Sequence, residues 1–510
     1  MTNNKYQVII TLAGNGKRFS DAGYTLPKYL LPVSENKCVL DLVADMYDGL
    51  DILFICNCHH VEKYNLINRF EKKNRRVIGV LPGQGPGYSI WQAKDYIDKK
   101  KKTIVQYCDT FQTMDLKAVL KEIDSSKADA GIFVTSEKCP SVYDGTKYGR
   151  VKIDKSGNVV GIKEKAEETY SPYLGCGTFY FKSGEYLISL LKTQIENKDK
   201  YFLNGEAYVN CTFNVVEDRK DKITAIDING YINLGVPTDY EEFMSRKKRF
   251  DKLNRFKEPV ELRNSTLMMP AVGLGSRFKS YGIPKPFIKI GDKHMCEMAK
   301  KFSFPTEQQI LAIRKDLPGY KKFVDYSKKN GINLHVFEHI TEGQAITVTE
   351  SLKDVANDQI VVVNSCDQGI LYDENKFYEI YPDADVIICG IKNYQKGIQN
   401  PKAYSWIRND GTNVLEITSK RCNGNPKDSY LFVSCVLYKN KSIIEKSVKR
   451  MIRRQARING EYYIDESLND SISLGYKVKM LEINSYLNWG TPEELELSLW
   501  WNNFFKEIEL

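Results

Sequence analysis

The segment VIITLAGNGKRF occupies residues 8–19, and its two parts predict two different structures. The apolar, β-branched run of residues 8–12 is typical of a buried strand. The glycines at positions 14 and 16 follow at once, where the chain must turn, and glycine lets backbone N–H groups approach a phosphate closely. The segment therefore predicts a strand that ends in a candidate phosphate-binding loop.

A second version of this segment, AVGLGSRF, occupies residues 271–278. A Pro-Lys pair follows each version, at Pro27-Lys28 and at Pro284-Lys285. Further residues recur in the same order at offsets between 255 and 259: Gly14 with Gly273, Gly85 with Gly343, Cys108-Asp109 with Cys366-Asp367, Lys165 with Lys420, the Asn-Gly-Glu triplet at 204–206 with that at 459–461, and Asn233 with Asn488. Matches in one order with so little drift predict a duplicated domain of about 250 residues.

The length of 510 residues is too great for one ordinary domain, which agrees with the duplication. The run RKKR at residues 246–249 and the proline at 259 mark a charged seam between the two halves. We therefore predict a first domain at residues 1–245, a charged helix and linker at 246–262, and a second domain at 263–510.

Short apolar runs alternate with helix-like stretches in both halves. The predicted strands are residues 8–12, 52–55, 77–81 and 103–107 in the first half and 267–271, 309–313, 334–337 and 360–364 in the second. Continuous β-branched runs separated by helices predict a mostly parallel sheet with helices on both faces. Each half is thus predicted to be a doubly wound, Rossmann-like α/β domain, in which ligands bind beyond the carboxyl ends of the strands.

Composition narrows the classes of partner and location. The net charge is +9, but 74 basic residues are scattered among 65 acidic ones, which favours small anionic ligands over nucleic acid. No run approaches the roughly 20 apolar residues that span a bilayer, so we expect no membrane segment. Twelve cysteines without paired spacing indicate free thiols in a reducing cytoplasm.

Cations and acids follow the predicted strand ends in both halves. Arg18 offers a fork of donors for phosphate oxygens, and Lys28 offers a compact positive charge. Asp109 lies just after a strand, where it either caps a helix or binds a metal. Metal binding is the favoured interpretation, because Asp367 ends an equivalent run in the second half. Neither a P-loop nor a dinucleotide fingerprint is present.

The whole set of motifs resembles the sugar-phosphate nucleotidyltransferases, also called NDP-sugar pyrophosphorylases. Four family motifs recur in the first half: the L-A-G-x-G-x-R loop at residues 12–18, P-K-x-L-x-P-V at 27–33, the strand-end Asp109, and N-x-G-x-P at 233–237. The Arg-Phe, Gly-Tyr, Pro-Lys version is similar to members linked to surface-polysaccharide synthesis. The resemblance covers nearly the whole chain, twice.

The resemblance implies a role for each matching residue. The nucleotide would lie against Leu12, Ala13, Gly14, Asn15, Gly16, Gln84 and Gly85 and, in the second half, against Gly273, Leu274, Gly275, Gly343 and Gln344. The catalytic cations would be Arg18, Lys28, Arg277 and Lys285. The sugar phosphate would contact Glu164, Lys165 and Lys420, and Mg²⁺ would be held by Asp109, Asn233, Asp367 and Asn488.

The second half departs from the first at its presumed base and sugar pockets. Gln344-Ala345 stands where the first half has Pro86-Gly87, and Ser419 stands where the first half has Glu164, so that acid is lost. The phosphate and metal residues are retained. We therefore expect the second half to use a different substrate or to be weaker, and not to be inactive.

The favoured hypothesis is a bifunctional, Mg²⁺-dependent enzyme that transfers a nucleotidyl group from an NTP to a sugar phosphate or similar small phosphate, yielding a nucleotide sugar and pyrophosphate. One alternative is a catalytic half with a regulatory or binding half. Another is a glycosyltransferase that uses a nucleotide sugar, although the Asp-x-Asp motif of such enzymes is missing after Cys108 and Cys366. The base, the acceptor and association into a homo-oligomer stay open.

The segment at residues 495–505 places several large apolar side chains on one helical face: Leu497, Trp500, Trp501, Phe504 and Phe505. Packing against its own domain is the favoured interpretation, ahead of a dimer interface and of a membrane surface.

Overall fold

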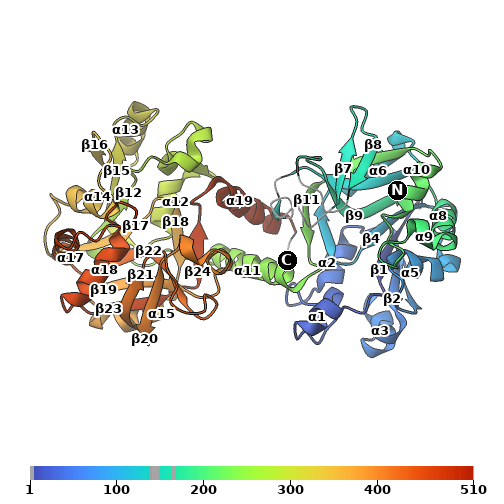
Figure 1. Ribbon diagram of the computed structural model, residues 1–510, viewed down its shortest axis with the longest axis horizontal. Coiled ribbons are helices and arrows are strands. Elements are labelled where there is room, and N and C mark those ends of the chain that lie inside the picture. Colours follow the sequence, from blue (N-terminus) through green and yellow to red (C-terminus); the bar gives the residue numbers. More distant parts are fainter. Residues whose placement is uncertain (1–4, 138, 141–148, 164–167, 509–510) are drawn as a thin grey trace. The chain divides into compact units, whose positions relative to one another are not determined.

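The computed structural model describes residues 5–137, 139–140, 149–163 and 168–508. The chain divides into two compact units, one formed by Met1–Phe250 with Trp500–Leu510 and the other by Asp251–Leu499. Each unit contains its own nine-stranded sheet with helices around it (Figure 1). The predicted α/β class is therefore correct.

The first sheet is centred on β1 (Tyr6–Leu12), the strand that precedes the first glycine loop. It pairs in parallel with β2 and β4, and the sheet runs in the order β10-β6-β9-β4-β1-β2-β3. The remaining strands of this unit are β2 (Asp51–Asn57), β3 (Arg75–Val80), β4 (Lys102–Tyr107), β5 (Thr110–Thr113), β6 (Ala130–Thr135), β7 (Arg150–Ile153), β8 (Val159–Lys163), β9 (Leu174–Phe181), β10 (Ile223–Asp227) and β11 (Asn229–Asn233).

The second sheet follows the same path through its strands, in the order β23-β19-β22-β17-β12-β15-β16. Its central strand, β12 (Leu262–Pro270), is parallel to both neighbours, as β1 is. The other strands of this unit are β13 (Lys289–Ile290), β14 (Lys293–His294), β15 (Thr306–Arg314), β16 (Asn333–Phe337), β17 (Ile360–Asn364), β18 (Gln368–Leu371), β19 (Val386–Ile391), β20 (Trp406–Asp410), β21 (Asn413–Thr418), β22 (Tyr430–Tyr438), β23 (Val478–Glu482) and β24 (Ser485–Asn488).

Both sheets are mixed rather than wholly parallel. β9 is antiparallel to its neighbours β4 and β6, and β22 is antiparallel to β17 and β19. A strand that is buried on both faces has the same apolar composition in either direction. Composition therefore located strands correctly without revealing that one strand in each path is reversed.

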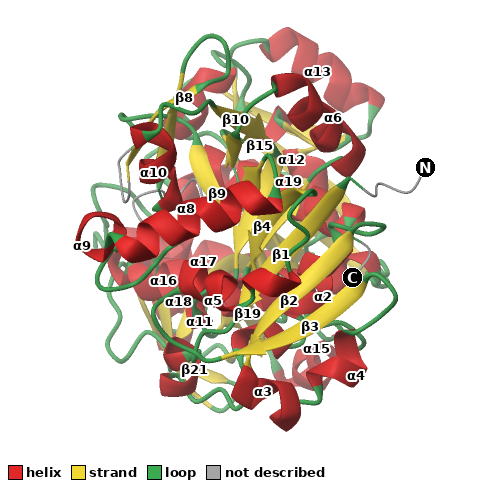
Figure 2. Ribbon diagram, turned by 90° about the vertical axis from the view of Figure 1, so that its right-hand side faces the viewer, coloured by secondary structure: helices red, strands yellow, loops and turns green. Residues whose placement is uncertain are grey.

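Helices cover both faces of the first sheet because successive residues of β1 point to opposite sides. Ile9 packs with Leu187 of α8, whereas Ile10 packs with Val43 of α2 and Leu120 of α6. Figure 2 shows α8 lying across the face on which it packs. The helices of this unit are α1 (Lys17–Asp21), α2 (Val39–Asp45), α3 (Cys58–Lys63), α4 (Leu66–Phe70), α5 (Pro86–Gln92), α6 (Leu116–Ser126), α8 (Gly184–Glu196), α9 (Lys198–Tyr201), α10 (Thr212–Asp218) and α11 (Pro237–Asn254).

The second sheet is covered in the same way. Leu267 packs with Met295 of α12 on one face, and Met268 packs with Val348 of α14 on the other. The helices that begin in this unit are α12 (Met295–Lys301), α13 (Tyr320–Lys329), α14 (Gln344–Ser351), α15 (Glu374–Ile380), α16 (Gln395–Gln399), α17 (Lys441–Arg453), α18 (Ile464–Ser473) and α19 (Pro492–Glu507).

The C-terminal residues differ from the sequence prediction, which assigned 263–510 to the second domain. Trp501, Phe504 and Phe505 of α19 are each only 3% exposed and share a core with Phe243 of α11, so that Trp500–Leu510 groups with the first unit. The sequence predicted an apolar face on this segment, but an apolar face does not say which core it completes.

Replacing Phe504 by alanine is expected to lower the free energy of unfolding of the first unit by about 3 kcal/mol, because it leaves a cavity in a packed aromatic core. The measurement is denaturant unfolding of the full-length protein followed by circular dichroism. Lys506→Ala, on the exposed side of the same helix, is the control and should change stability by less than about 0.5 kcal/mol. Equal effects of the two variants would show that the segment is not part of this core.

Two further observations bear on location. All twelve cysteines lie among the described residues, and each is a free thiol. Within the described part of the chain, no helix combines the length and the apolar composition that crossing a bilayer requires.

Candidate active site

The two glycine loops begin where the central strands end. In the first unit the chain leaves β1 at Leu12 and enters α1 through Gly16, whose φ of 65° lies in the left-handed region. In the second unit Gly275 has a φ of 59° at the equivalent turn. Glycine adopts this conformation without the steric cost that other residues meet, so both loops need glycine at this point.

A lysine and an aspartate form an ion pair beside each loop. In the first unit Lys28 Nζ donates to Asp109 Oδ2, and in the second Lys285 Nζ donates to Asp367 Oδ2. The four side chains are between 15% and 29% exposed. Residues about eighty positions apart in the sequence therefore meet at the carboxyl end of each central sheet.

The Lys28 ammonium stays charged at neutral pH. Burial lowers the pKa of Lys28, but the negative charge of Asp109 opposes it, and the net pKa lies above the ordinary lysine value. A raised folded-state pKa means that the stabilisation is fully present below the ordinary lysine pKa and is lost only as pH rises through the higher value. Lys28 therefore contributes no pH dependence near neutrality.

An asparagine lies next to the aspartate of the first unit. The antiparallel pair β5–β11 places Asn233 opposite Thr110, and Leu234 N donates to Asp109 O at 2.7 Å. Asn233 Oδ1 accepts from Gly235 N at 2.7 Å. A Cβ at position 235 would lie 2.6 Å from Asp109 Oδ2 and 2.7 Å from Asn233 Oδ1. The two side-chain oxygens thus converge over one glycine.

The second unit repeats this arrangement with an additional acid. Asn488 Oδ1 accepts from Gly490 N at 2.9 Å, and a Cβ at position 490 would lie 3.0 Å from Asn488 Oδ1 and 3.4 Å from Asp367 Oδ2. Glu494 joins them, because its Oε1 accepts from Asn488 Nδ2 at 2.9 Å. Sequence reasoning missed Glu494. Asp239, at the same offset of 255, was the available signal.

In each unit the aspartate and asparagine oxygens beside the glycine, here called the cradle, fit a small divalent cation. A carboxylate and an amide carbonyl face the same point, and both are oxygen ligands of the type that Mg²⁺ prefers. The glycine between them leaves open the space that a Cβ would fill. Asp109 and Asn233 in the first unit, and Asp367 and Asn488 in the second, are therefore the residues that could hold the metal.

The loops predicted to contact the base are fixed by backbone contacts. Gln84 O accepts from Ala207 N at 2.8 Å, and a Cβ on Gly85 would lie 2.8 Å from Ala207 O. In the second unit a Cβ on Gly343 would lie 2.5 Å from Tyr462 N. Glycine is required at these positions because another backbone segment approaches closely.

Most of the predicted site residues of the second unit line two cavities. A cavity of about 500 Å³ is lined by Gly273, Lys285, Gly343, Gln344 and Lys420 among others. A second cavity, of about 540 Å³, is lined by residues that include Gly273, Leu274, Gly275, Lys285 and Asp367. Gly273 and Lys285 border both, so the glycine loop and the lysine lie where the two hollows adjoin.

The remaining predicted residues fall into three groups. Leu12 and Ala13 are buried, so only their backbone is available to a nucleotide. Arg18, Arg277 and Gly14 are exposed beside the loops, and Asn15 accepts a hydrogen bond from Asn57. Glu164 and Lys165 lie outside the described residues.

The cysteine that precedes each aspartate lies in the core, as strand alternation predicts. Cys108 is 3% exposed and Cys366 is 6% exposed, and burial raises the pKa of each thiol to about 12. These thiols are therefore protonated at neutral pH and take no part in the chemistry of the site.

Comparison with known proteins finds matches that cover about half of the chain. Residues 7–242 match the family model for nucleotidyl transferases. The bifunctional protein GlmU of Methanocaldococcus jannaschii is 24% identical over 249 residues, which cover 48% of this chain and 55% of that protein. The chain thus spans about half the length of this curated relative.

Solved structures of similar proteins include the nucleoside-diphosphate-sugar pyrophosphorylase from Vibrio cholerae RC9, with 19% identity, 46% of this chain and 99% of that chain covered, and a TM-score of 0.39. The inositol-1-phosphate CTP transferase from T. maritima is 15% identical, with 48% of this chain and 97% of that chain covered and a TM-score of 0.38.

Proposed function

Residues 7–242 belong to the nucleotidyl transferase family, and from this premise we propose that the first unit transfers a nucleotidyl group from an NTP to a sugar phosphate or similar small phosphate, releasing pyrophosphate. The observation that carries the proposal is the cluster around Gly235. There a lysine ammonium, an aspartate and an asparagine carbonyl meet beside the glycine loop.

The chemistry of this reaction matches such a cluster. A phosphate oxygen of the acceptor attacks the α-phosphorus of the NTP, and the bond from that phosphorus to the pyrophosphate oxygen breaks. A phosphate is already an anionic nucleophile, so no strong general base is needed. The main barrier is repulsion between two anions, which positioned cations lower. Lys28 supplies a fixed charge at this point, and Arg18 lies exposed beside the loop for the departing pyrophosphate.

Asp109 and Asn233 are the residues that would hold Mg²⁺ in the first unit. When bound, this ion neutralises charge on the phosphates. The Asp109 carboxylate accepts a hydrogen bond from the Lys28 ammonium in the structure. With Asp109 among its ligands, the ion would lie close to Lys28, and both positive charges would be near the phosphates.

We propose the same reaction for the second unit. It has the same strand order, the same lysine–aspartate pair and the same asparagine over a glycine. The protein would then carry two sites and be bifunctional. Its products would be nucleotide sugars of the kind used in surface-polysaccharide synthesis, as the resemblance of its motifs implies.

The test is pyrophosphate release by the full-length protein with Mg²⁺, each of the four NTPs and a panel of sugar and alcohol phosphates. Isolated halves are unsuitable, because Trp500–Leu510 packs with the first unit. Lys28→Ala should lower the activity of the first site by about 100-fold, and Lys285→Ala should do the same to the second. Both variants should remain folded, as judged by circular dichroism.

The pattern of loss separates the alternatives. Two activities that respond to different variants establish two sites. A single activity that responds only to Lys28→Ala makes the second unit a regulatory or binding module. Silence of the wild-type protein towards every combination, together with binding of a nucleotide sugar, overturns the proposal in favour of a glycosyltransferase.

A further inference from the structure

Two positions that correspond in the two halves of the chain carry one carboxylate in each half, but the carboxylate stands at a different one of the two positions. The offset of 255 that relates Lys165 to Lys420 also relates Glu164 to Ser419 and Asn210 to Asp465. The first half has an acid at the earlier position and an amide at the later one, whereas the second half has a hydroxyl and then an acid. The number of carboxylates at these two positions is therefore the same in both halves.

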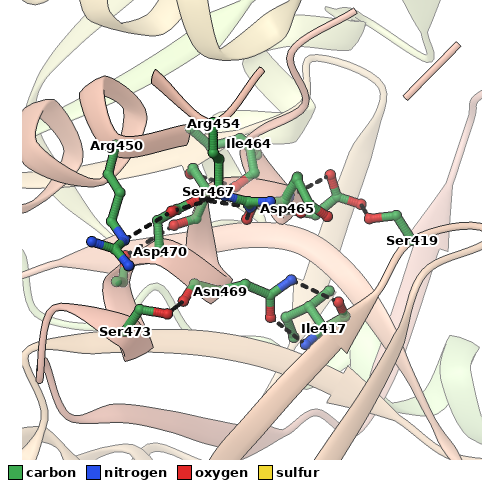
Figure 3. A network of polar contacts seen from close by, with 12 residues as sticks. Ile417, Ser419, Arg450, Arg454, Ile464, Asp465, Ser467, Asn469, Asp470 and Ser473 are labelled. Carbon is green, nitrogen blue, oxygen red and sulfur yellow. Dashed lines mark hydrogen bonds and ion pairs between the residues drawn. The ribbon is translucent and has the colours of Figure 1, made fainter. Parts of the chain in front are cut away.

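The structure joins the two positions of the second unit. Asp465 Oδ2 accepts a hydrogen bond from Ser419 Oγ at 3.1 Å (Figure 3). It accepts another from Ser405 Oγ at 2.5 Å. Ser405 and Asp465 line the cavity of about 500 Å³, as does Lys420, which follows Ser419 in the chain. The second unit therefore has a carboxylate from α18 in contact with Ser419, at the position where the first half has Glu164.

Helix α18 holds Asp465 firmly in this place. Asn469 bonds both the N and the O of Ile417, each at 2.9 Å, which ties the helix to β21 just before Ser419. The next residue, Asp470, is 2% exposed: Arg454 Nε shares its hydrogen between both carboxylate oxygens at 3.0 Å, and Arg454 Nη2 donates to Oδ2 at 2.8 Å (Figure 3). Charge-assisted contacts of this kind fix α18 against the end of α17.

The chemistry of the cluster limits what it can bind. A serine hydroxyl has one donor hydrogen and two acceptor lone pairs, and a carboxylate has acceptors only. Ser405 and Ser419 both give their hydrogen to Asp465. Ser405 and Asp465, which line the cavity, therefore present only acceptors and a negative charge to it, and Ser419 bonds Asp465 from beside them. A ligand group that donates hydrogen bonds fits there, and an anionic group does not.

We propose that Asp465 selects the acceptor of the second site, admitting phosphates whose far end carries hydroxyl or ammonium groups and rejecting those that carry a carboxylate. The inference rests on the proposed function of the second unit. Asp465 acts with Ser405 and Ser419, and Lys420, whose Nζ donates to Ala403 O at 2.7 Å, borders the same cavity.

A purely structural role for Asp465 is the rival explanation. The residue lies in the first turn of α18, where a carboxylate stabilises the positive end of a helix. A structural role predicts a loss of stability on replacement and no change in the ranking of ligands. The ranking is therefore the measurement that separates the two explanations.

The experiment uses the full-length protein with Asp109→Ala, which silences the first site. Binding of glucose 1-phosphate, phosphoethanolamine and glucuronic acid 1-phosphate is measured by titration calorimetry with Mg²⁺. The α,β-methylene analogues of the four NTPs are present, because they cannot release pyrophosphate. The variants are Asp465→Asn, Ser419→Glu, and the double variant Ser419→Glu/Asp465→Asn, which reproduces the residue pair of the first half.

We expect the parent protein to bind the better of the first two phosphates at least about tenfold more tightly than glucuronic acid 1-phosphate. Asp465→Asn should reduce this preference to less than about threefold, Ser419→Glu should weaken the binding of glucuronic acid 1-phosphate further by adding a second carboxylate, and the double variant should restore the preference of the parent. The better ligand of the parent identifies hydroxyls or an ammonium group as the selected donor.

A preference that survives Asp465→Asn overturns the inference, as does equal binding of glucuronic acid 1-phosphate or no binding of any of the three by the parent. Pyrophosphate release by the parent from the natural NTPs is recorded separately. Its absence would refute transfer at the second site, whereas the binding preference alone decides the role of Asp465.

Discussion

Replacing Asp109 by alanine is expected to lower pyrophosphate release at the first site by at least about 1,000-fold. The substitution removes the one carboxylate of the cradle over Gly235 and also frees the Lys28 ammonium from its partner. Asn233 alone offers a single neutral oxygen, which binds Mg²⁺ weakly. The rate is measured with saturating NTP and acceptor over a range of Mg²⁺ concentrations.

The same variant should fold normally. Asp109 follows β4, is 15% exposed and belongs to none of the apolar core clusters, so its loss is expected to cost no more than about 2 kcal/mol of stability. Thermal unfolding followed by circular dichroism measures this. Asp95→Ala, which removes an 83% exposed carboxylate of the same unit, is the matched control and should alter neither rate nor stability. An unfolded Asp109→Ala protein would make Asp109 a structural residue.

Local and repeated patterns explain why the sequence alone could single out the residues that the structure brings together. The glycine loop, Lys28, Asp109 and Asn233 each belong to a short motif, and each recurs in the second half at nearly the same offset. A glycine whose φ must be positive and an acid at a strand end leave their trace in the few residues around them. The positions were therefore accessible without a structure.

Contacts between distant residues were not predictable in the same way. The sequence places Lys28 and Asp109 in one site, but it does not show that the ammonium bonds the carboxylate across 81 positions. Nor does it show that Glu494 joins Asn488 beside Asp367. Such contacts are set by how the strands and loops pack in the fold, and neither a periodic pattern nor a short motif in the sequence predicts that packing.

The C-terminal helix and Asp465 are two further examples of contacts that the sequence does not predict. The apolar face around Phe504 was evident, but the core that it fills lies with Phe243, which only the fold reveals. The sequence also showed that Ser419 replaces an acid of the first half. Only the hydrogen bond between Ser419 and Asp465 shows that an acid 46 positions away stands in contact with it.

Replacing Gly235 by alanine is expected to lower the activity of the first site by about 1,000-fold while leaving the protein folded. The new Cβ would lie 2.6 Å from Asp109 Oδ2 and 2.7 Å from Asn233 Oδ1, closer than non-bonded carbon and oxygen atoms approach. Both oxygens must move apart, and each is a proposed metal ligand. A displacement of about 1 Å at a reacting centre costs roughly 100-fold, and two ligands move at once.

Gly490→Ala in the second unit is the matched comparison, because the added Cβ would lie farther from its neighbouring atoms there. Its Cβ would lie 3.0 Å from Asn488 Oδ1 and 3.4 Å from Asp367 Oδ2, distances that shifts of a few tenths of an ångström relieve. We expect a loss of about tenfold at the second site, measured as pyrophosphate release with the acceptor of that site. The two clearances thus predict the order of the two losses. Equal losses, or the larger one at Gly490, would mean that the oxygens over these glycines are not the metal ligands on which the rate depends.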